Sequence, residues 1–232
     1  MSEVEISARD GSGKFGAYVV APAAPPAPAI ILIQEIFGIN RNMRTWCENL
    51  AAQGYLTICP DLFWRQEPGI QLTDQTEAEW QHAFRLYQGF DLEKGMEDLA
   101  ATLDFVKNHP ACNGKVGCVG FCLGGRLAVL MSARTAIDVS VSYYGVALDQ
   151  HVSEFQNIRK PLLIHVAGLD KYVPPEVLAT LRHAVKDLPG VELHVYDGVD
   201  HAFARINGQN FNAEAAERAN QRTVGFLRGA LG

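Results

Sequence analysis

Apolar and polar positions along the chain fall into segments that predict strands and helices. Near the start, Val4 to Ala8 and Phe15 to Ala21 alternate residue by residue, which is typical of half-buried strands. The turn sequence Asp10-Gly11-Ser12-Gly13 between them predicts an antiparallel hairpin at a sheet edge. We interpret the proline-rich residues 21–28 as a connector, since proline fits neither a helix interior nor a central strand. The apolar run 29–34 predicts a strand buried on both faces.

Beyond residue 34, segments with the apolar spacing of a helix alternate with segments typical of a strand. Strands are predicted over 55–59, 115–119, 139–144, 161–166 and 191–196, and helices over 42–53, 77–87, 91–107, 123–133, 174–188 and 212–231. This alternation predicts an α/β protein of the α/β-hydrolase type, with a mostly parallel central sheet and helices on both faces. No linker or internal repeat divides the chain, so we expect one domain over residues 1–232.

Composition and charge restrict the class of protein. The 232 residues are 48% hydrophobic, enough for a sizeable core, and the net charge of −6 comes without a basic cluster, so no nucleic-acid partner is expected. The acidic first residues do not resemble a secretory signal, and no apolar run is long enough to span a membrane. Five cysteines without a framework spacing favour reduced thiols in a cytoplasmic protein. We expect a monomer, although no residue pattern bears on the oligomeric state.

The segment from Val116 to Arg126 carries the clearest chemical signal. It contains the pattern G-x-C-x-G, in which Gly120 ends a predicted strand, Cys122 follows, and a predicted helix begins at Leu123. Such a pattern is typical of a nucleophile elbow, whose glycines let two backbone segments pass closely. The helix N-terminus would stabilise a thiolate. The alternative is a buried small cysteine at an ordinary tight turn.

An acid and a histidine follow at later strand ends, in the order expected for an α/β-hydrolase. Asp170 follows the strand 161–166, and His201 follows the strand 191–196. His201 would take the proton of the Cys122 thiol, while Asp170 would orient the imidazole. Backbone amides of Ile36 and Leu123 would form the oxyanion hole. This chemistry is acyl transfer, and it needs neither a metal nor another cofactor.

Each of these residues also has a simpler interpretation. Asp170 could be a turn former, and Asp200 competes with it as the acid. Neighbouring side chains rarely aim at each other's rings, which argues against a pairing of Asp200 with the imidazole of His201. His165 and His194 lie inside strand patterns, so we interpret them as sheet residues.

At this level of detail the chain resembles the dienelactone hydrolases, the carboxymethylenebutenolidase family of α/β-hydrolases, over nearly its whole length. The segments that carry the resemblance are Gln34-Glu35-Ile36-Phe37-Gly38, Cys59-Pro60-Asp61-Leu62, Gly114-Lys115-Val116-Gly117, Gly120-Phe121-Cys122-Leu123-Gly124-Gly125, Tyr143-Tyr144-Gly145 and His201-Ala202-Phe203-Ala204-Arg205.

The resemblance implies a role for each member of the site. The nucleophile falls on Cys122, the acid on Asp170 and the base on His201. It also implies that Glu35, which could otherwise be simply solvated, contacts the cysteine in the resting enzyme and that substrate binding releases a reactive thiolate. A neutral resting thiol is protected from oxidation, which agrees with this role.

Substrates of the family carry a carboxylate beside an unsaturated lactone, held by two arginines. One arginine matches Arg205, but the other falls on Trp80, which could stack on a flat ring, enlarge an apolar pocket or merely pack. Arg85 is a poor substitute, because five helical residues turn it about 140° away. Three further aromatic residues fall on family pocket positions, each with core packing as an alternative: Phe84, Tyr87 and Tyr144.

These observations predict a hydrolase that cleaves a dienelactone or a similar lactone or ester through an acyl-thioester on Cys122. An esterase of the same fold acting on more neutral esters or lactones is the first alternative. A protein that keeps the fold for ligand binding or thiol sensing, without turnover, is the second.

Overall fold

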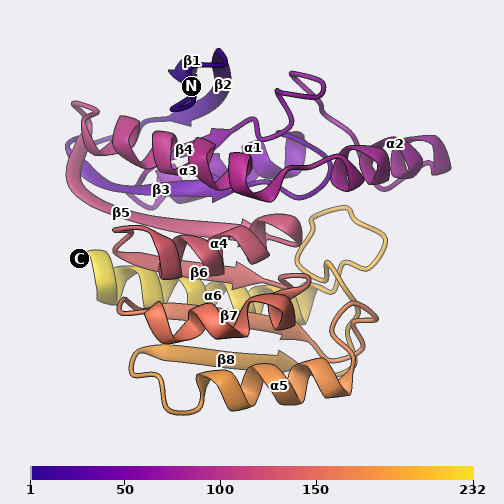
Figure 1. Ribbon diagram of the computed structural model, residues 1–232. Helices are drawn as coiled ribbons and strands as arrows, with labels where there is room; N and C mark the ends of the chain where they lie inside the picture. Colours follow the sequence, from indigo (N-terminus) through magenta and orange to yellow (C-terminus); the bar gives the residue numbers. More distant parts are fainter. Residues whose placement is uncertain (1) are drawn as a thin grey trace. The chain divides into compact units, whose positions relative to one another are not determined.

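The computed structural model describes residues 2–232, and its helices and strands are labelled in Figure 1. The contacts divide the chain into two compact units, with the division between Gly117 and Cys118. The organisation of the chain as one domain stays a prediction. All five cysteines are free thiols.

The first unit is an α/β layer that begins with the predicted hairpin. Strands β1 and β2 pair antiparallel with Ile6 opposite Phe15, β2 pairs antiparallel with β4, and β3 runs parallel to β4. The strand order is β1-β2-β4-β3 with β5 next, so the hairpin lies at the edge, as predicted. The elements are β1 (Ser2–Ser7), β2 (Lys14–Val20), β3 (Ala27–Ile33), α1 (Arg41–Ala52), β4 (Leu56–Pro60), α2 (Glu77–Gln88), α3 (Leu92–Lys107) and the start of β5 (Cys112–Phe121).

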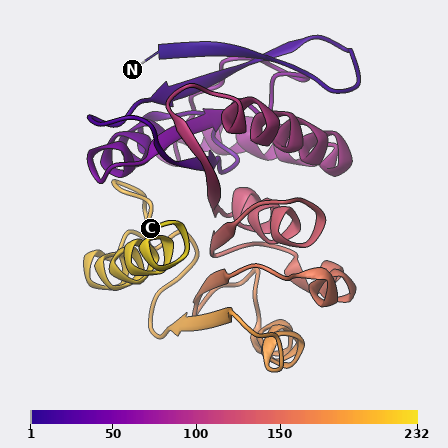
Figure 2. The ribbon, with the colours of Figure 1, turned by 90° about the vertical axis from the view of Figure 1, so that its left-hand side faces the viewer.

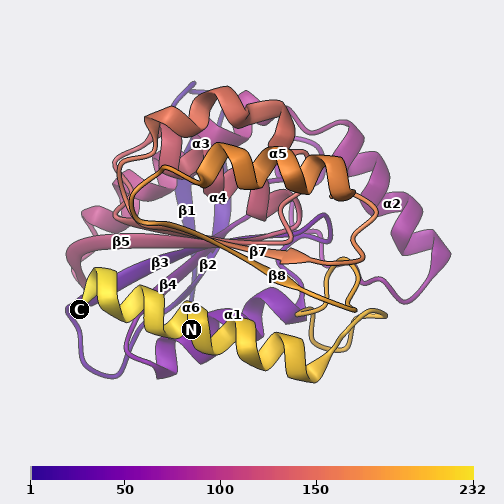
Figure 3. The ribbon, with the colours of Figure 1, turned by 90° about the horizontal axis from the view of Figure 1, so that it is seen from below.

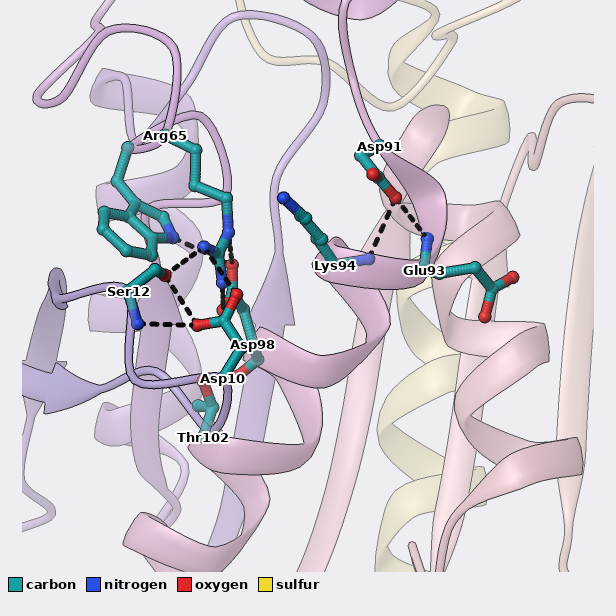
Figure 4. A network of polar contacts seen from close by, with 9 residues as sticks. Asp10, Ser12, Arg65, Asp91, Glu93, Lys94, Asp98 and Thr102 are labelled. Atoms are coloured by element: carbon teal, nitrogen blue, oxygen red, sulfur yellow. Dashed lines mark hydrogen bonds and ion pairs between the residues drawn. The ribbon is translucent and has the colours of Figure 1, made fainter.

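Helix α1 covers one face of this strand layer and α3 the other (Figure 3). The helices begin where the sequence supplies N-caps: the Asn40 side chain accepts the amide of Met43, and Asp91 accepts the amides of Glu93 and Lys94 (Figure 4). Such caps satisfy amide groups that have no acceptor within the helix.

A partly buried ion-pair network fixes the hairpin turn to α3 (Figure 4). Arg65 Nη2 donates to Asp98 Oδ1 at 2.8 Å and forms a second ion pair with Asp10 at 3.0 Å in the β1–β2 turn. Trp64 Nε1 donates to the other Asp98 oxygen at 2.8 Å. Because Asp98 is 1% exposed, removal of Arg65 would leave a buried carboxylate without its ion-pair partner, which is expected to destabilise the contact between the hairpin turn and α3.

The second unit carries the remaining strands in a parallel arrangement. The end of β5 is followed in the sheet by β6, β7 and β8, and both β6–β7 and β7–β8 pair parallel. Helices α4 and α5 cover one face and α6 the other (Figures 2 and 3). The elements are α4 (Leu123–Arg134), β6 (Val139–Tyr143), the 3-10 helix η1 (Leu148–Asn157), β7 (Leu162–Ala167), α5 (Pro175–Val185), β8 (Val191–Tyr196) and α6 (Ala213–Leu231).

The alternating pattern, the mostly parallel sheet and helices on both faces are therefore confirmed, but three details differ. Strand β3 begins at Ala27 and includes Pro28, which is tolerated because the pairing with β4 begins only at Ala29. Strand β5 begins at Cys112 and runs through Gly114, whose φ of +93° needs a glycine. The 3-10 helix η1 was not predicted, although Leu148, Val152 and Phe155 recur there at the i, i+4 and i+7 spacing of a helix face.

Candidate functional site

Cys122 lies at the sharp turn between β5 and α4, with φ 55° and ψ −113°. This conformation is uncommon for a residue with a side chain and is typical of strained functional positions. The neighbouring glycines are needed for space: a Cβ on Gly120 would lie 1.9 Å from the carbonyl oxygen of Gly124, and one on Gly125 would lie 2.7 Å from that of Tyr143. The predicted elbow geometry is therefore present.

Backbone hydrogen bonds hold the elbow in place. The Cys122 amide donates to the Tyr143 carbonyl at 3.0 Å, and the Cys122 carbonyl accepts from Arg126 at 3.2 Å and from Val146 at 3.4 Å. The Cys122 side chain occupies the N-cap position of α4 without capping the helix, and the residue is 7% exposed. A negative charge on the sulfur would face the positive end of the helix dipole.

Asp170 and His201 form a buried pair on the loops after β7 and β8. Asp170 Oδ2 lies 2.7 Å from His201 Nδ1, and its Oδ1 accepts the amide of Tyr172 at 2.9 Å. The two side chains are 0% and 8% exposed. Asp200 instead accepts the backbone amide of His201 at 2.6 Å, so its carboxylate is occupied away from the ring.

The imidazole of His201 is strongly biased toward its charged form. Burial alone would lower its pKa, but attraction to Cys122 and Asp170, including the hydrogen bond with Asp170, raises the pKa of His201 to about 10. The other ring nitrogen, Nε2, is shielded from solvent and has no partner with normal hydrogen-bond geometry among the described residues. A ring held at Nδ1 by a carboxylate, with Nε2 available, can transfer a proton.

Aromatic rings enclose the imidazole. Tyr144, fully buried and with φ 39°, places its ring edge-on to His201 with a centroid distance of 5.1 Å and contacts Phe203 at 5.5 Å. Tyr172 meets His201 at 5.0 Å. Sequence reasoning missed Tyr172, although its position two residues after the predicted acid was a usable signal.

Arg205 is buried at 6% exposure in the turn that follows His201. Its amide donates to the Ala202 carbonyl at 3.0 Å, and a Cβ on Gly208 would lie 2.9 Å from Arg205 Cδ. Because Gly208 has no side chain, the Arg205 side chain can pack against its backbone.

Two predicted residues of the first unit, Glu35 and Ile36, lie in the loop after β3, separated from the strand by Gln34, and are 1% and 6% exposed. Their loop is fixed against residues 70–72: the Leu72 amide donates to the Phe37 carbonyl at 2.9 Å, and a Cβ on Gly38 would lie 2.0 Å from the Ile70 carbonyl oxygen. Glu35 is thus a carboxyl group in a rigid, enclosed position, and its contact with Cys122 stays a prediction.

The other predicted pocket residues of this unit lie on α2. Trp80 donates from Nε1 to the Asp74 carbonyl at 3.1 Å, and its ring meets Phe37 edge-on at 5.2 Å. Trp80 therefore supports the loop that carries Ile36. Phe84 is 43% exposed and lies 6.0 Å from Tyr87, so core packing does not explain Phe84.

Residues 15–231 match the model of the Dienelactone hydrolase family. The chain belongs to the dienelactone hydrolase family. A Pseudomonas putida carboxymethylenebutenolidase is 41% identical over 97% of this chain and 94% of its own length. An Azospirillum brasilense protein provisionally named a carboxymethylenebutenolidase is 48% identical over the full length of both chains.

Solved structures agree with this family. A Klebsiella pneumoniae protein, provisionally named a dienelactone hydrolase, aligns with a TM-score of 0.84 at 25% identity, covering 98% of both chains. Dienelactone hydrolases act on lactones or esters, so the chain is a lactone or ester hydrolase. Within residues 2–232, no helix has the length and apolar character needed to cross a bilayer, and no group of three or more His, Cys, Asp or Glu could hold a metal ion.

Proposed function

We propose that this member of the dienelactone hydrolase family cleaves its substrate through an acyl-thioester on Cys122, with His201 as the proton-transfer group and Asp170 as its partner. The observation that carries the proposal is the buried Asp170–His201 pair at 2.7 Å, whose imidazole interacts electrostatically with the elbow cysteine. An elbow thiol, an oriented imidazole and a carboxylate are the parts that cysteine-dependent acyl transfer requires.

The reaction proceeds in two halves. When substrate displaces Glu35, the Cys122 thiol transfers its proton to His201 Nε2, and the thiolate attacks the carbonyl carbon. The charged His201 ring then donates that proton to the departing alkoxide, leaving a thioester. The neutral ring then accepts a proton from water, which attacks the thioester and releases the acid and the thiol. The raised pKa of His201 supports its role as the acid of the first half.

Backbone amides of Leu123 and Ile36 stabilise the oxyanion in this proposal. Leu123 is the first residue of α4, where amides lack helical acceptors, and Ile36 lies in the fixed loop after β3. Glu35 would hold the resting thiol neutral until substrate displaces it.

The substrate we propose is a dienelactone bearing a carboxylate. The names of the relatives and the buried cation of Arg205 support it. Trp80, where the family has a second arginine, favours a second candidate, a more neutral ester or lactone. Loss of one of two charge-assisted contacts would weaken carboxylate binding by about 1.5 to 3 kcal/mol. We further propose a monomeric, cytoplasmic enzyme that acts on small molecules.

The proposal is tested by comparing kcat/KM for a carboxylate-bearing dienelactone and for a neutral ester of similar leaving-group ability. We expect preference for the dienelactone and loss of both activities in Cys122→Ala. Better use of the neutral ester would shift the substrate to the second candidate. Turnover in folded Cys122→Ala would overturn the mechanism, and a wild type that binds both ligands without turnover would indicate a binding protein.

A further inference from the structure

The turn after β7 holds more than the acid of the triad. The Leu169 amide donates to the Val199 carbonyl at 2.9 Å, and the Val173 amide donates to the Asp170 carbonyl at 3.0 Å. The Tyr172 amide donates to the Asp170 carboxylate at 2.9 Å. These bonds fix the backbone of the turn. They therefore also fix the Cα positions of Lys171 and Tyr172, two residues of the turn that have no role in the proposed mechanism.

The first of these side chains is Tyr172. Its ring lies 5.0 Å from the His201 ring and is edge-on to it. Tyr144 contacts the same imidazole but is fully buried, whereas Tyr172 is 39% exposed. Of the two rings against the proton-transfer group, Tyr172 is therefore the one that a ligand can reach from solvent.

The second side chain is Lys171. Its Nζ lies 5.1 Å from the centre of the Tyr172 ring, and the residue is exposed. A cation over an aromatic ring is attracted by the electrons of the ring face, which favours this placement. A positive charge thus lies beside the solvent-accessible ring that contacts His201, in a protein of net charge −6.

We propose that Lys171 and Tyr172 form a substrate-recognition element for planar, carboxylate-bearing substrates. The Tyr172 ring offers a flat apolar surface to an unsaturated ring, and Lys171 attracts the carboxylate. Lys171 would supply a positive charge for the carboxylate in addition to that of Arg205. This inference rests on the proposed function, and it adds two specificity residues from a turn that was expected to hold only the acid.

The contribution of Lys171 is tested by the ratio of kcat/KM for an anionic dienelactone to that for a neutral ester. Lys171→Gln is expected to lower this ratio about two- to fivefold at low salt, the size of an exposed charge interaction. The difference should fade near 1 M salt, where the screening length is about 3 Å. Lys186→Gln is the matched control, because it removes the same charge after α5 rather than before it, and it should leave the ratio unchanged.

The contribution of the ring is tested by two variants of Tyr172. Tyr172→Ala is expected to raise KM for the planar substrate about three- to tenfold with a smaller change in kcat, whereas Tyr172→Phe retains most of the affinity. Thermal unfolding establishes that both variants fold, and if the alanine variant does not, Tyr172→Leu replaces it. A fall confined to kcat would mean that Tyr172 merely positions the triad, and it would overturn the recognition role.

The outcomes separate this inference from the proposed function. If the wild type turns over both substrates through Cys122 and Lys171→Gln leaves the ratio unchanged, the recognition element is wrong and the mechanism stands. An equal fall in Lys186→Gln would also contradict it. If Cys122→Ala retains turnover, the proposed mechanism fails whatever the Lys171 variants show.

Discussion

At the scale of single residues, the two oxygens of Asp170 do different work. Oδ2 contacts the imidazole at 2.7 Å, while Oδ1 is held by the Tyr172 amide at 2.9 Å, so the carboxylate cannot rotate freely. Asp200, the other candidate for the acid, accepts a hydrogen bond from the backbone amide of His201. Asp170 is therefore the partner of the imidazole because its side chain points at the His201 ring. Asp200 is adjacent in sequence, but its side chain points at a backbone amide.

Replacement of these acids gives a matched prediction. Asp170→Asn should lower kcat roughly 10³- to 10⁴-fold, because the amide no longer stabilises the charged imidazole and favours the wrong tautomer. Asp200→Asn should change kcat by less than about tenfold. Steady-state kinetics with circular dichroism to establish folding would measure both. A larger loss in Asp200→Asn would assign the acid to Asp200.

At the scale of elements, the close passage between β5 and α4 is what places the thiol. The sequence predicted this passage from the glycine spacing, and it predicted the order of nucleophile, acid and histidine from the strand ends. It did not predict η1, although Leu148, Val152 and Phe155 recur there at helical spacing. It also did not predict the early start of β5, because Asn113-Gly114 is typical of a turn rather than of a strand. Nor could it reveal the ring of Tyr172 on His201, since ring contacts depend on how distant loops pack.

Two glycine substitutions, one in the elbow and one outside it, are expected to change the free energy of unfolding in opposite directions. Gly120→Ala should lower the free energy of unfolding by about 1 to 3 kcal/mol or more, since its Cβ would lie 1.9 Å from the Gly124 carbonyl oxygen. Gly225→Ala in α6 meets nothing within 4 Å and should raise the free energy of unfolding by about 0.5 to 1 kcal/mol. Urea unfolding measures both, and a stable, active Gly120→Ala would contradict the required close passage.

At the scale of the whole molecule, two buried histidines are held in opposite charge states. Burial, together with His194 and Arg222, places the pKa of His165 well below 6.5, and its ring contacts Thr223 and Tyr196 within the core. His201 has its pKa raised to about 10. At these two histidines the folded protein therefore binds fewer protons than the unfolded chain at acid pH and more at alkaline pH.

The free energy of unfolding should accordingly decline on both sides of about pH 6.5. The contribution of His201 is complete below its ordinary value of 6.5 and is lost as pH rises toward about 10. That of His165 is present above 6.5 and is lost as pH falls. Urea unfolding of wild type and His201→Gln between pH 5 and 10 tests this, with the alkaline slope reduced in the variant. An unchanged slope would contradict the raised pKa.

If Cys122 carries the substrate acyl group, peptide mass spectrometry after rapid acid quenching will detect the acyl-enzyme. With a dienelactone, the peptide containing Cys122 should gain the full mass of the lactone, because the ring-opened alkoxide stays attached. No such adduct should form in Cys122→Ala, which should also lack turnover. Turnover in that variant, or an adduct on another residue that forms and decays with turnover, would contradict the account.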